Sequence, residues 1–162
     1  MIDSDTKTLL ERLTLALERL APPVSPPADF SGALLYRYEA RTGAFLAAPD
    51  YALSLDLLVG IDKQKARFAE NLRRFAEGLP ANNALLWGSR GAGKSSMAKA
   101  AFMDEAVRHP GLRMVEVDRD DIGALPRLFD ALRGRSEAFV VLCDDLSFEE
   151  GPGGLTAAAK TL

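Results

Sequence analysis

Apolar and polar positions alternate in a regular way along the second half of the chain. Strands are predicted at residues 84–87, 112–117 and 139–143, and the last of these is apolar throughout, as expected for a parallel strand covered on both faces. Between these runs, apolar residues recur at helical spacing over residues 96–108 and 122–133. Strands that alternate with helices in this way predict an α/β fold with a parallel sheet.

Another helix is predicted upstream, where the sequence from Leu57 leads to Asp62 as its capping residue. Gly78 and Pro80 are expected to end this helix. Its apolar stripe is predicted to consist of Phe68, Leu72, Phe75 and Leu79. For the helix at residues 96–108, we expect the buried face to be formed by Met97, Ala100, Ala101 and Val107, with His109 and Pro110 as its stop.

The first 20 residues form an amphipathic pattern from Asp3 to Leu20, with one stripe of leucines. That stripe consists of Leu10, Leu13, Leu17 and Leu20. It needs a partner surface, either the rest of this chain or another subunit, and we favour packing within the chain. We therefore divide the chain into an N-terminal helix at 1–20, a proline-rich linker and irregular segment at 21–53, and an α/β domain at 54–162. Within the middle segment, only residues 34–38 suggest a strand.

Composition narrows the possible classes of protein. The 162 residues are 48% hydrophobic and carry a net charge of −3, which gives no clear signal for binding nucleic acid. No apolar run approaches the ~20 residues of a membrane-spanning helix, and no secretory signal begins the chain. Cys143 is the only cysteine, so no internal disulfide can form. These features favour a cytoplasmic protein.

A glycine-rich motif between the strand at 84–87 and the following helix carries the most specific chemistry. Residues 88–95 read Gly-Ser-Arg-Gly-Ala-Gly-Lys-Ser and match the phosphate-loop pattern G-x-x-x-x-G-K-[ST] at every fixed position. Such a loop turns successive N–H groups toward a phosphate chain, at the positive end of a helix. We expect Lys94 to reach the β- and γ-phosphates and Ser95 to ligate Mg²⁺. The predicted nucleotide contacts are Gly88, Ser89, Arg90, Gly91, Ala92, Gly93, Lys94, Ser95 and Ser96.

Paired acids follow the apolar strand at 139–143, in the Walker B arrangement. Asp144 is placed to hold Mg²⁺ at the carboxyl end of the strand, where open α/β sheets bind ligands. Asp145 is the candidate for positioning the attacking water, with Lys94 as the second catalytic residue. Asp145 is one methylene shorter than the glutamate usual in ATP-hydrolysing relatives, so Glu149 or Glu150 remains an alternative, although we favour a solvated helix start for those two.

Several other polar residues are interpreted structurally. Asp118, Asp120 and Asp121 are expected to cap the helix at 122–133, because their spacing fails the calcium-loop pattern. Cys143 is expected in the core and His109 at a helix end. Arg90 remains open between contacting phosphate and pointing to solvent.

Together these residues resemble the AAA+ class of P-loop ATPases. Val59, Gly60 and Ile61, ahead of a helix, resemble the segment that lines the adenine pocket in that class. The runs at 60–65, 80–83, 116–118 and 143–149 are similar to a bacterial AAA+ family of unknown function, and the resemblance covers about residues 54–150. It implies a three-layer αβα core, binding of ATP and Mg²⁺, a homo-oligomer in the full-length form and an unknown protein partner.

The sequence departs from the AAA+ pattern near its C-terminus. That class has a further strand between the phosphate-loop strand and the Walker B strand, and it comes after Walker B in the chain. No such strand is found before Leu162, so the chain is expected to be a fragment or incomplete gene product, or else to have a rearranged sheet. We favour a fragment with an incomplete sheet that is inactive alone.

The leading hypothesis for function is an ATP-hydrolysing module that drives a conformational change in a partner. A nucleotide-dependent binding switch with little hydrolysis is the alternative. A small-molecule kinase is less favoured, and a GTPase least of all, since no Asn-Lys-x-Asp sequence is present.

Overall fold

The computed structural model describes residues 4–20 and 28–144. Its centre is a four-stranded sheet in the order β2-β1-β3-β4. The strands are β1 (Leu35–Glu39), β2 (Ala44–Ala48), β3 (Leu112–Val117) and β4 (Ala138–Cys143). β1 and β2 are antiparallel, whereas β1 and β3, and β3 and β4, are parallel. The chain is therefore an α/β protein with an open, mostly parallel sheet, as the alternation of apolar runs predicted.

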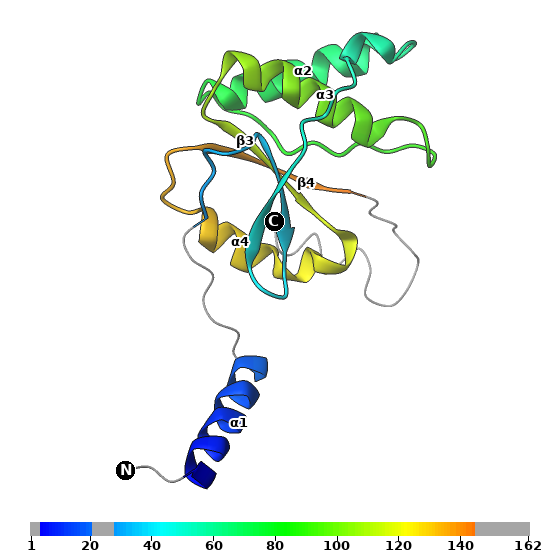
Figure 1. The fold of residues 1–162 in the computed structure, drawn as a ribbon. Coiled ribbons are helices and arrows are strands. Elements are labelled where there is room, and N and C mark those ends of the chain that lie inside the picture. Colours follow the sequence, from blue (N-terminus) through cyan, green and yellow to red (C-terminus); the bar gives the residue numbers. More distant parts are fainter. Residues whose placement is uncertain (1–3, 21–27, 145–162) are drawn as a thin grey trace.

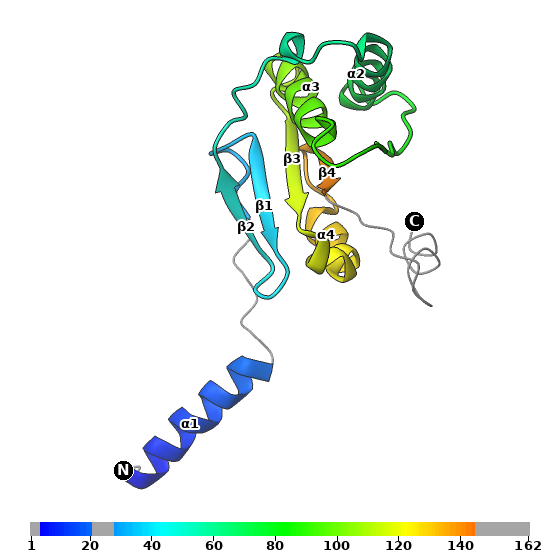
Figure 2. The same cartoon turned by 90° about the vertical axis from the view of Figure 1, so that its right-hand side faces the viewer.

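Helices cover both faces of this sheet (Figure 1). α2 (Asp62–Ala76) and α3 (Lys94–Arg108) lie over one face, and α4 (Leu125–Leu132) lies over the other (Figure 2). Side chains of a strand alternate between the faces. Met114 of β3 accordingly packs in a cluster with residues of α2 and α3, while Val115 packs with Leu128 of α4. The result is the three-layer arrangement expected for the core.

The hairpin of β1 and β2 lies in the segment expected to be a linker and irregular chain. Residues 34–38 were the only candidate strand there, but both five-residue strands form, and β1 pairs directly with β3. Phe30 is only 1% exposed and packs against the hairpin through edge-on ring contacts with Tyr36 and Phe45. Residues 28–48 thus contribute to the same sheet and core as the later strands.

The helices differ from expectation mainly at their starts. α3 begins at Lys94, inside the glycine-rich motif, and the predicted core residue Val107 is 79% exposed. Phe102 and Ala106 occupy the buried face instead, because they project toward the sheet. The helix predicted at 122–133 starts only at Leu125, where Pro126 occupies the first turn. A 3-10 helix, η2 (Arg119–Ala124), precedes it.

The start of α2 also differs from the prediction. A short 3-10 helix, η1 (Leu55–Leu57), comes before it, and Ile61 is its N-cap residue. Asp62 lies in the first turn and makes an ion pair with Lys65 at 2.9 Å instead of capping the helix. The end agrees with prediction, since Gly78 has φ 71° and Leu79 N–H donates to the carbonyl of Arg74.

The strand predicted at residues 84–87 does not form. Leu85 is 65% exposed and Trp87 86% exposed, and this segment joins no strand of the sheet. A strand needs a neighbour within about 4.8 Å to satisfy its backbone groups. Among the described strands, β4 pairs with β3 alone, and a cleft of about 1000 Å³ separates its other edge from residues 81–88.

α1 (Ser4–Leu20) lies apart from the sheet in Figure 2. Leu10 and Leu13 are 50% and 56% exposed, so the described part of the chain does not supply the partner surface that we favoured for the leucine stripe. Neither α1 nor any other described helix is long and apolar enough to cross a membrane.

Candidate functional site

The glycine-rich motif forms a loop that leads directly into α3. Gly88 has φ 142° and Gly93 has φ 78°, conformations that residues with a Cβ rarely adopt. Gly93 is the N-cap residue of α3, and its carbonyl accepts the N–H of Met97 at 2.8 Å. The first N–H groups of the helix have no partner within the helix and point toward the loop. The sequence therefore builds a positive helix end at the mouth of the loop.

The side chain of Lys94 folds back over this loop. Its Nζ donates to the carbonyl oxygens of Gly88 at 3.1 Å and Ser89 at 2.9 Å. Both acceptors belong to the loop itself, so the ammonium group lies across the loop where an anion would enter. Phosphate oxygens are stronger acceptors for an ammonium group than neutral carbonyls. Lys94 is thus held at the place where the sequence predicts the phosphates.

Ser95 and Asp144 meet across the site. The Ser95 hydroxyl donates to Oδ1 of Asp144 at 2.5 Å, although the two residues are 49 positions apart. α3 supplies Ser95 from its first turn, and β4 supplies Asp144 immediately after its last residue, Cys143. The structure therefore brings together the two residues that the sequence assigned to Mg²⁺. Asp145, Glu149 and Glu150 lie outside the described residues.

The chemistry of this pair fits a magnesium ion. Both side chains offer oxygen, which Mg²⁺ prefers, and Mg²⁺ in nucleotide sites takes only one or two protein ligands beside water and phosphate oxygens. Within residues 4–20 and 28–144, no group of three or more His, Cys, Asp or Glu residues could hold a metal by itself. Among the described residues, Ser95 and Asp144 would therefore need further ligands from water or phosphate to complete a magnesium site.

The remaining loop residues line the same cleft. Arg90, Gly91 and Ser96 are on its wall with Lys94, Ser95 and Asp144. The carbonyl of Ser89 accepts the N–H of Ala92 at 3.3 Å, which closes the turn at the tip of the loop. Arg90 is exposed at the rim of the cleft, a position from which it can reach either solvent or a bound anion.

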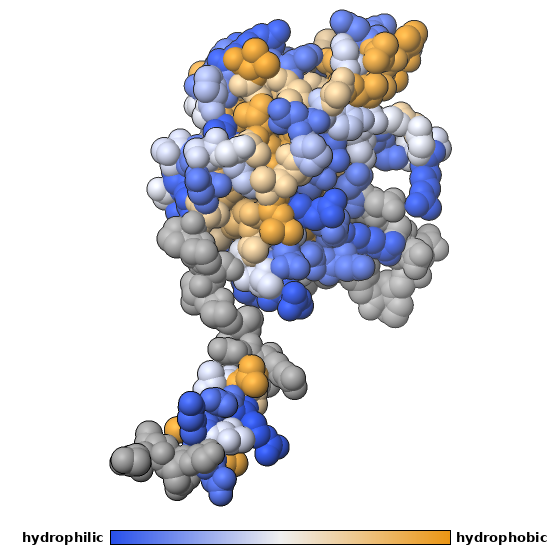
Figure 3. Space-filling model, viewed as in Figure 1, coloured by the Kyte–Doolittle hydropathy of each residue, from blue (hydrophilic) through white to orange (hydrophobic). Residues whose placement is uncertain are grey.

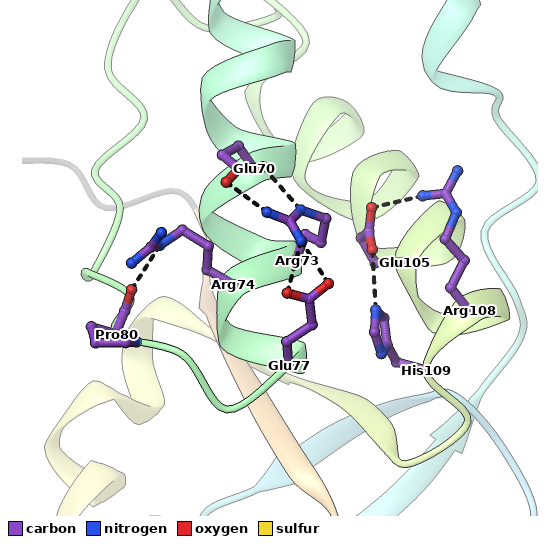
Figure 4. A network of polar contacts seen from close by, with 8 residues as sticks. All are labelled: Glu70, Arg73, Arg74, Glu77, Pro80, Glu105, Arg108 and His109. Carbon is purple, nitrogen blue, oxygen red and sulfur yellow. Dashed lines mark hydrogen bonds and ion pairs between the residues drawn. The ribbon is translucent and has the colours of Figure 1, made fainter.

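The chain that enters the loop is held by α2. The side-chain amide of Asn71 donates to the carbonyl of Asn82 at 2.7 Å, and its oxygen accepts the N–H of Asn82 at 3.0 Å. One turn further on, Arg74 Nε donates to the carbonyl of Pro80 at 2.9 Å (Figure 4). These bonds hold the backbone at Pro80 and Asn82, just before the unpaired segment at residues 84–87. Asn71 and Arg74 were not predicted from the sequence, because no pattern indicates that a polar helix residue will bond to the backbone of another segment.

Charged pairs stiffen the end of α2 beside these anchors. Arg73 donates to the carboxylates of both Glu70 and Glu77 (Figure 4). The hydrogen bond from Arg73 lowers the pKa of Glu70, and the two carboxylates raise the pKa of Arg73. All three side chains are partly exposed, so the pairs orient the helix end more than they stabilise the fold.

A second ion pair joins α3 to the sheet. Lys99 Nζ lies 2.8 Å from Oε1 of Glu116 on β3, and both side chains are only about one-fifth exposed. Lys99 is one turn beyond Ser95, and Glu116 is level with Leu142 in the register of β3 and β4. The pair therefore helps to set the height of Ser95 above Asp144. From the sequence, Glu116 was noted only because residues 116–118 resemble the bacterial AAA+ family, and Lys99 was not identified.

The segment predicted to line an adenine pocket follows Leu58, which lies against the glycine-rich loop. Cδ2 of Leu58 approaches Gly93 closely, at 3.6 Å from the position that a Cβ would take. The next residue, Val59, is 88% exposed, Gly60 has φ 82°, and Ile61 caps α2. Figure 3 shows apolar surface where η1 leads into α2. Leu58 is thus the residue of this segment that the structure places against the loop.

Cys143 precedes Asp144 and belongs to the core, as predicted. It packs at the edge of the cluster under α4, and burial raises the pKa of its thiol. Burial thus favours the protonated form of the thiol.

The fold is that of an α/β protein with a mostly parallel open sheet, and its glycine-rich loop lies beside the carboxyl end of β4. Among known families, the model described as "Protein of unknown function (DUF815)" matches residues 31–160, so the chain belongs to this family. The match includes the β1–β2 hairpin and begins after α1. Searches of curated proteins and of solved structures give no match.

Proposed function

We propose that this protein is an ATP-binding module of the AAA+ type, which couples binding and hydrolysis of Mg²⁺-ATP to a conformational change in a partner protein. The observation that carries the proposal is the contact of Ser95 with Asp144 beside a loop crossed by Lys94. A phosphate loop, its lysine, a hydroxyl and a strand-end carboxylate are the parts that nucleotide hydrolysis requires. We place the active form in the cytoplasm as a homo-oligomer.

Each residue has a distinct part in this proposal. Backbone N–H groups from Gly91 to Ser96 hold the phosphates, and Lys94 exchanges its carbonyl acceptors for phosphate oxygens. When bound, Mg²⁺ neutralises charge on the phosphates, and Ser95 and Asp144 would hold it. Asp145 follows Asp144 in the chain and is the candidate that orients the attacking water.

Adenine is proposed to bind beside the segment from Leu58 to Ile61. Leu58 already lies against the loop at Gly93, and the exposed side chain of Val59 offers an apolar surface for a base. Burial of Val59 on binding would account for a large apolar residue that is 88% exposed.

The alternative is a switch that binds ATP with little hydrolysis, and it keeps every contact named above. A small-molecule kinase is a weaker candidate. The test is to measure ATP binding and steady-state phosphate release on the same preparation of the full-length protein. Binding with phosphate release supports the ATPase, binding without release supports the switch, and phosphorylation of an added metabolite supports the kinase. Absence of ATP binding overturns all three.

A further inference from the structure

Two polar contacts join α3 to neighbouring strands of the sheet. Ser95, in the first turn of α3, donates to Asp144, which follows the last residue of β4. Lys99, one helical turn further on, lies with its Nζ 2.8 Å from Oε1 of Glu116 on β3. α3 lies over the face of the sheet to which both contacts are made (Figure 2). The helix is therefore tied to two strands at two points that are one turn apart.

The two contacts have nearly the same spacing on the helix and on the sheet. Ser95 and Lys99 are four residues apart, which is about 6 Å along a helix axis. Glu116 is level with Leu142 in the register of β3 and β4. Leu142 is two residues before Asp144, which is about 6.6 Å along a parallel strand. Both contacts can therefore form at the same time when α3 has one particular position along the strands.

Apolar packing holds the rest of α3 on the sheet. Phe102 and Ala106 lie in one cluster with Leu112 and Met114 of β3. Apolar attraction is non-directional, so it fixes the position of a helix along a strand less sharply than a polar contact between two defined atoms does. The polar contacts nearer the start of α3 are thus the ones suited to set this position.

The pair of Lys99 and Glu116 is well placed for that part. Its side chains are 21% and 20% exposed, so solvent and salt screen the pair less than they screen a pair at the surface. The ammonium group of Lys99 also lies over the ring of Tyr51, 5.8 Å from its centroid, which restricts it further. Partly buried ion pairs often add little net stability, and the setting of register is their best-attested structural role.

We propose that Lys99 and Glu116 form a positioning pair for the magnesium site, which fixes α3 along the strands so that Ser95 meets Asp144. The inference deepens the proposed function and rests on it for its magnesium measurement. It assigns a part in the site to two residues that touch neither the nucleotide nor the metal. Loss of the pair moves Ser95 relative to Asp144 and weakens the magnesium-dependent part of ATP binding, while the fold remains.

The direct test replaces both members of the pair by apolar residues, since such a replacement is often neutral for stability. The variant combines Lys99→Met with Glu116→Met. The matched control combines Glu105→Met with Arg108→Met, which removes an ion pair of 2.7 Å that lies within α3 and does not reach the sheet. Isothermal titration calorimetry of the full-length proteins gives the affinity for ATP with Mg²⁺ and with EDTA, and urea denaturation checks the fold.

We expect Mg²⁺ to strengthen ATP binding tenfold or more in the wild type and the control, and less than threefold in the variant, with affinities in EDTA within twofold of one another. Lys99→Arg keeps a cationic donor and should retain most of the magnesium effect. If the double variant does not fold, Glu116→Gln takes its place under the same criterion. An equal magnesium effect in the wild type, the control and the variant would overturn the positioning pair.

A double-mutant cycle tests the coupling without nucleotide, so it decides the matter even if the protein does not bind ATP. Ser95→Ala is compared by urea denaturation in the wild type and in the background without the ion pair. It should raise the unfolding equilibrium constant about fivefold in the wild type, where it removes the bond to Asp144, and less than twofold in the other background. Equal factors, or no effect in the wild type, would overturn the proposal. A coupled cycle in a protein that binds no ATP would overturn the proposed function alone.

Discussion

Ser95 Oγ lies 2.5 Å from Oδ1 of Asp144, which links the first turn of α3 to the end of β4. A hydroxyl on an ionised carboxylate makes one of the shorter and stronger hydrogen bonds in proteins. The bond holds two oxygen ligands at the mouth of the glycine-rich loop, within the same cleft as Lys94. This contact turns two separate sequence motifs into one site.

Lys94→Ala is expected to abolish detectable ATP binding. The substitution removes the ammonium group that crosses the loop, and charge-assisted bonds of this kind contribute about 1.5–3 kcal/mol each. Isothermal titration calorimetry checks the result. Lys63→Ala, on the exposed side of α2, is the matched control and should bind as the wild type does. Unchanged affinity in Lys94→Ala would mean that the loop does not bind phosphate.

Ser95→Ala is expected to lower ATP affinity in the presence of Mg²⁺ by about tenfold or more, which corresponds to about 1.4 kcal/mol. The hydroxyl is lost as a ligand, while the backbone of the loop is unchanged. Ser96→Ala is the control, because its proposed contact is made by the backbone N–H. If both variants lose the same affinity in calorimetry, Ser95 has no special role at the metal.

Asn71→Ala should loosen the chain that enters the loop. Both bonds to Asn82 are lost, and since Asn71 lies at the surface we expect a decrease of about 1 kcal/mol in the free energy of unfolding. Urea denaturation measures this change, and Asn83→Ala, at an exposed position of the same segment, serves as the control. If Asn71→Ala also lowers ATP affinity, although Lys94 is present in this variant, then Asn71 positions the loop. Equal stability of both variants would remove Asn71 from that role.

Hydrogen exchange should distinguish the two edges of β4. Ala138 N–H donates to Gly111 at 3.0 Å, and every second residue of a parallel strand bonds the same neighbour. The amide of Val140 therefore faces β3 and should exchange slowly. The amides of Val141 and Leu85, which face the gap or lie in the unpaired segment, should exchange much faster. Protection of Val141 equal to that of Val140 would contradict an open edge.

Much of this arrangement was predictable where local pattern and topology agree. β3 has the predicted bounds because apolar side chains project to both of its faces, and the loop motif correctly predicted that a helix follows, although that helix begins at Lys94. The hairpin of β1 and β2 was largely missed from the sequence. Its strands are stabilised by packing on Phe30 and by pairing with β3, and β3 is far away in the chain. Residues 84–87 have a strand's composition, but composition cannot supply the neighbouring strand that they lack.

Within the site, the sequence could indicate chemistry but not the contacts that hold it. The motif spacing predicted that Ser95 and Asp144 share one end of the sheet, and the structure brings them into contact. Lys99 and Glu116 could not be paired from sequence, because their contact depends on how α3 crosses β3. Leu58 was not singled out from the sequence for the same reason, because packing decides which residue of a loop turns inward.

The magnesium dependence of ATP binding in Asp144→Asn tests the central claim most directly. Calorimetric titrations of wild type and variant with ATP, each with Mg²⁺ and with EDTA, give four affinities. The amide keeps the size of the side chain but loses the charge that attracts the metal. We predict that Mg²⁺ strengthens binding to the wild type by tenfold or more and strengthens binding to Asp144→Asn far less, while the affinities in EDTA stay similar. An equal magnesium effect in both proteins would contradict the assignment of Asp144 to the metal site.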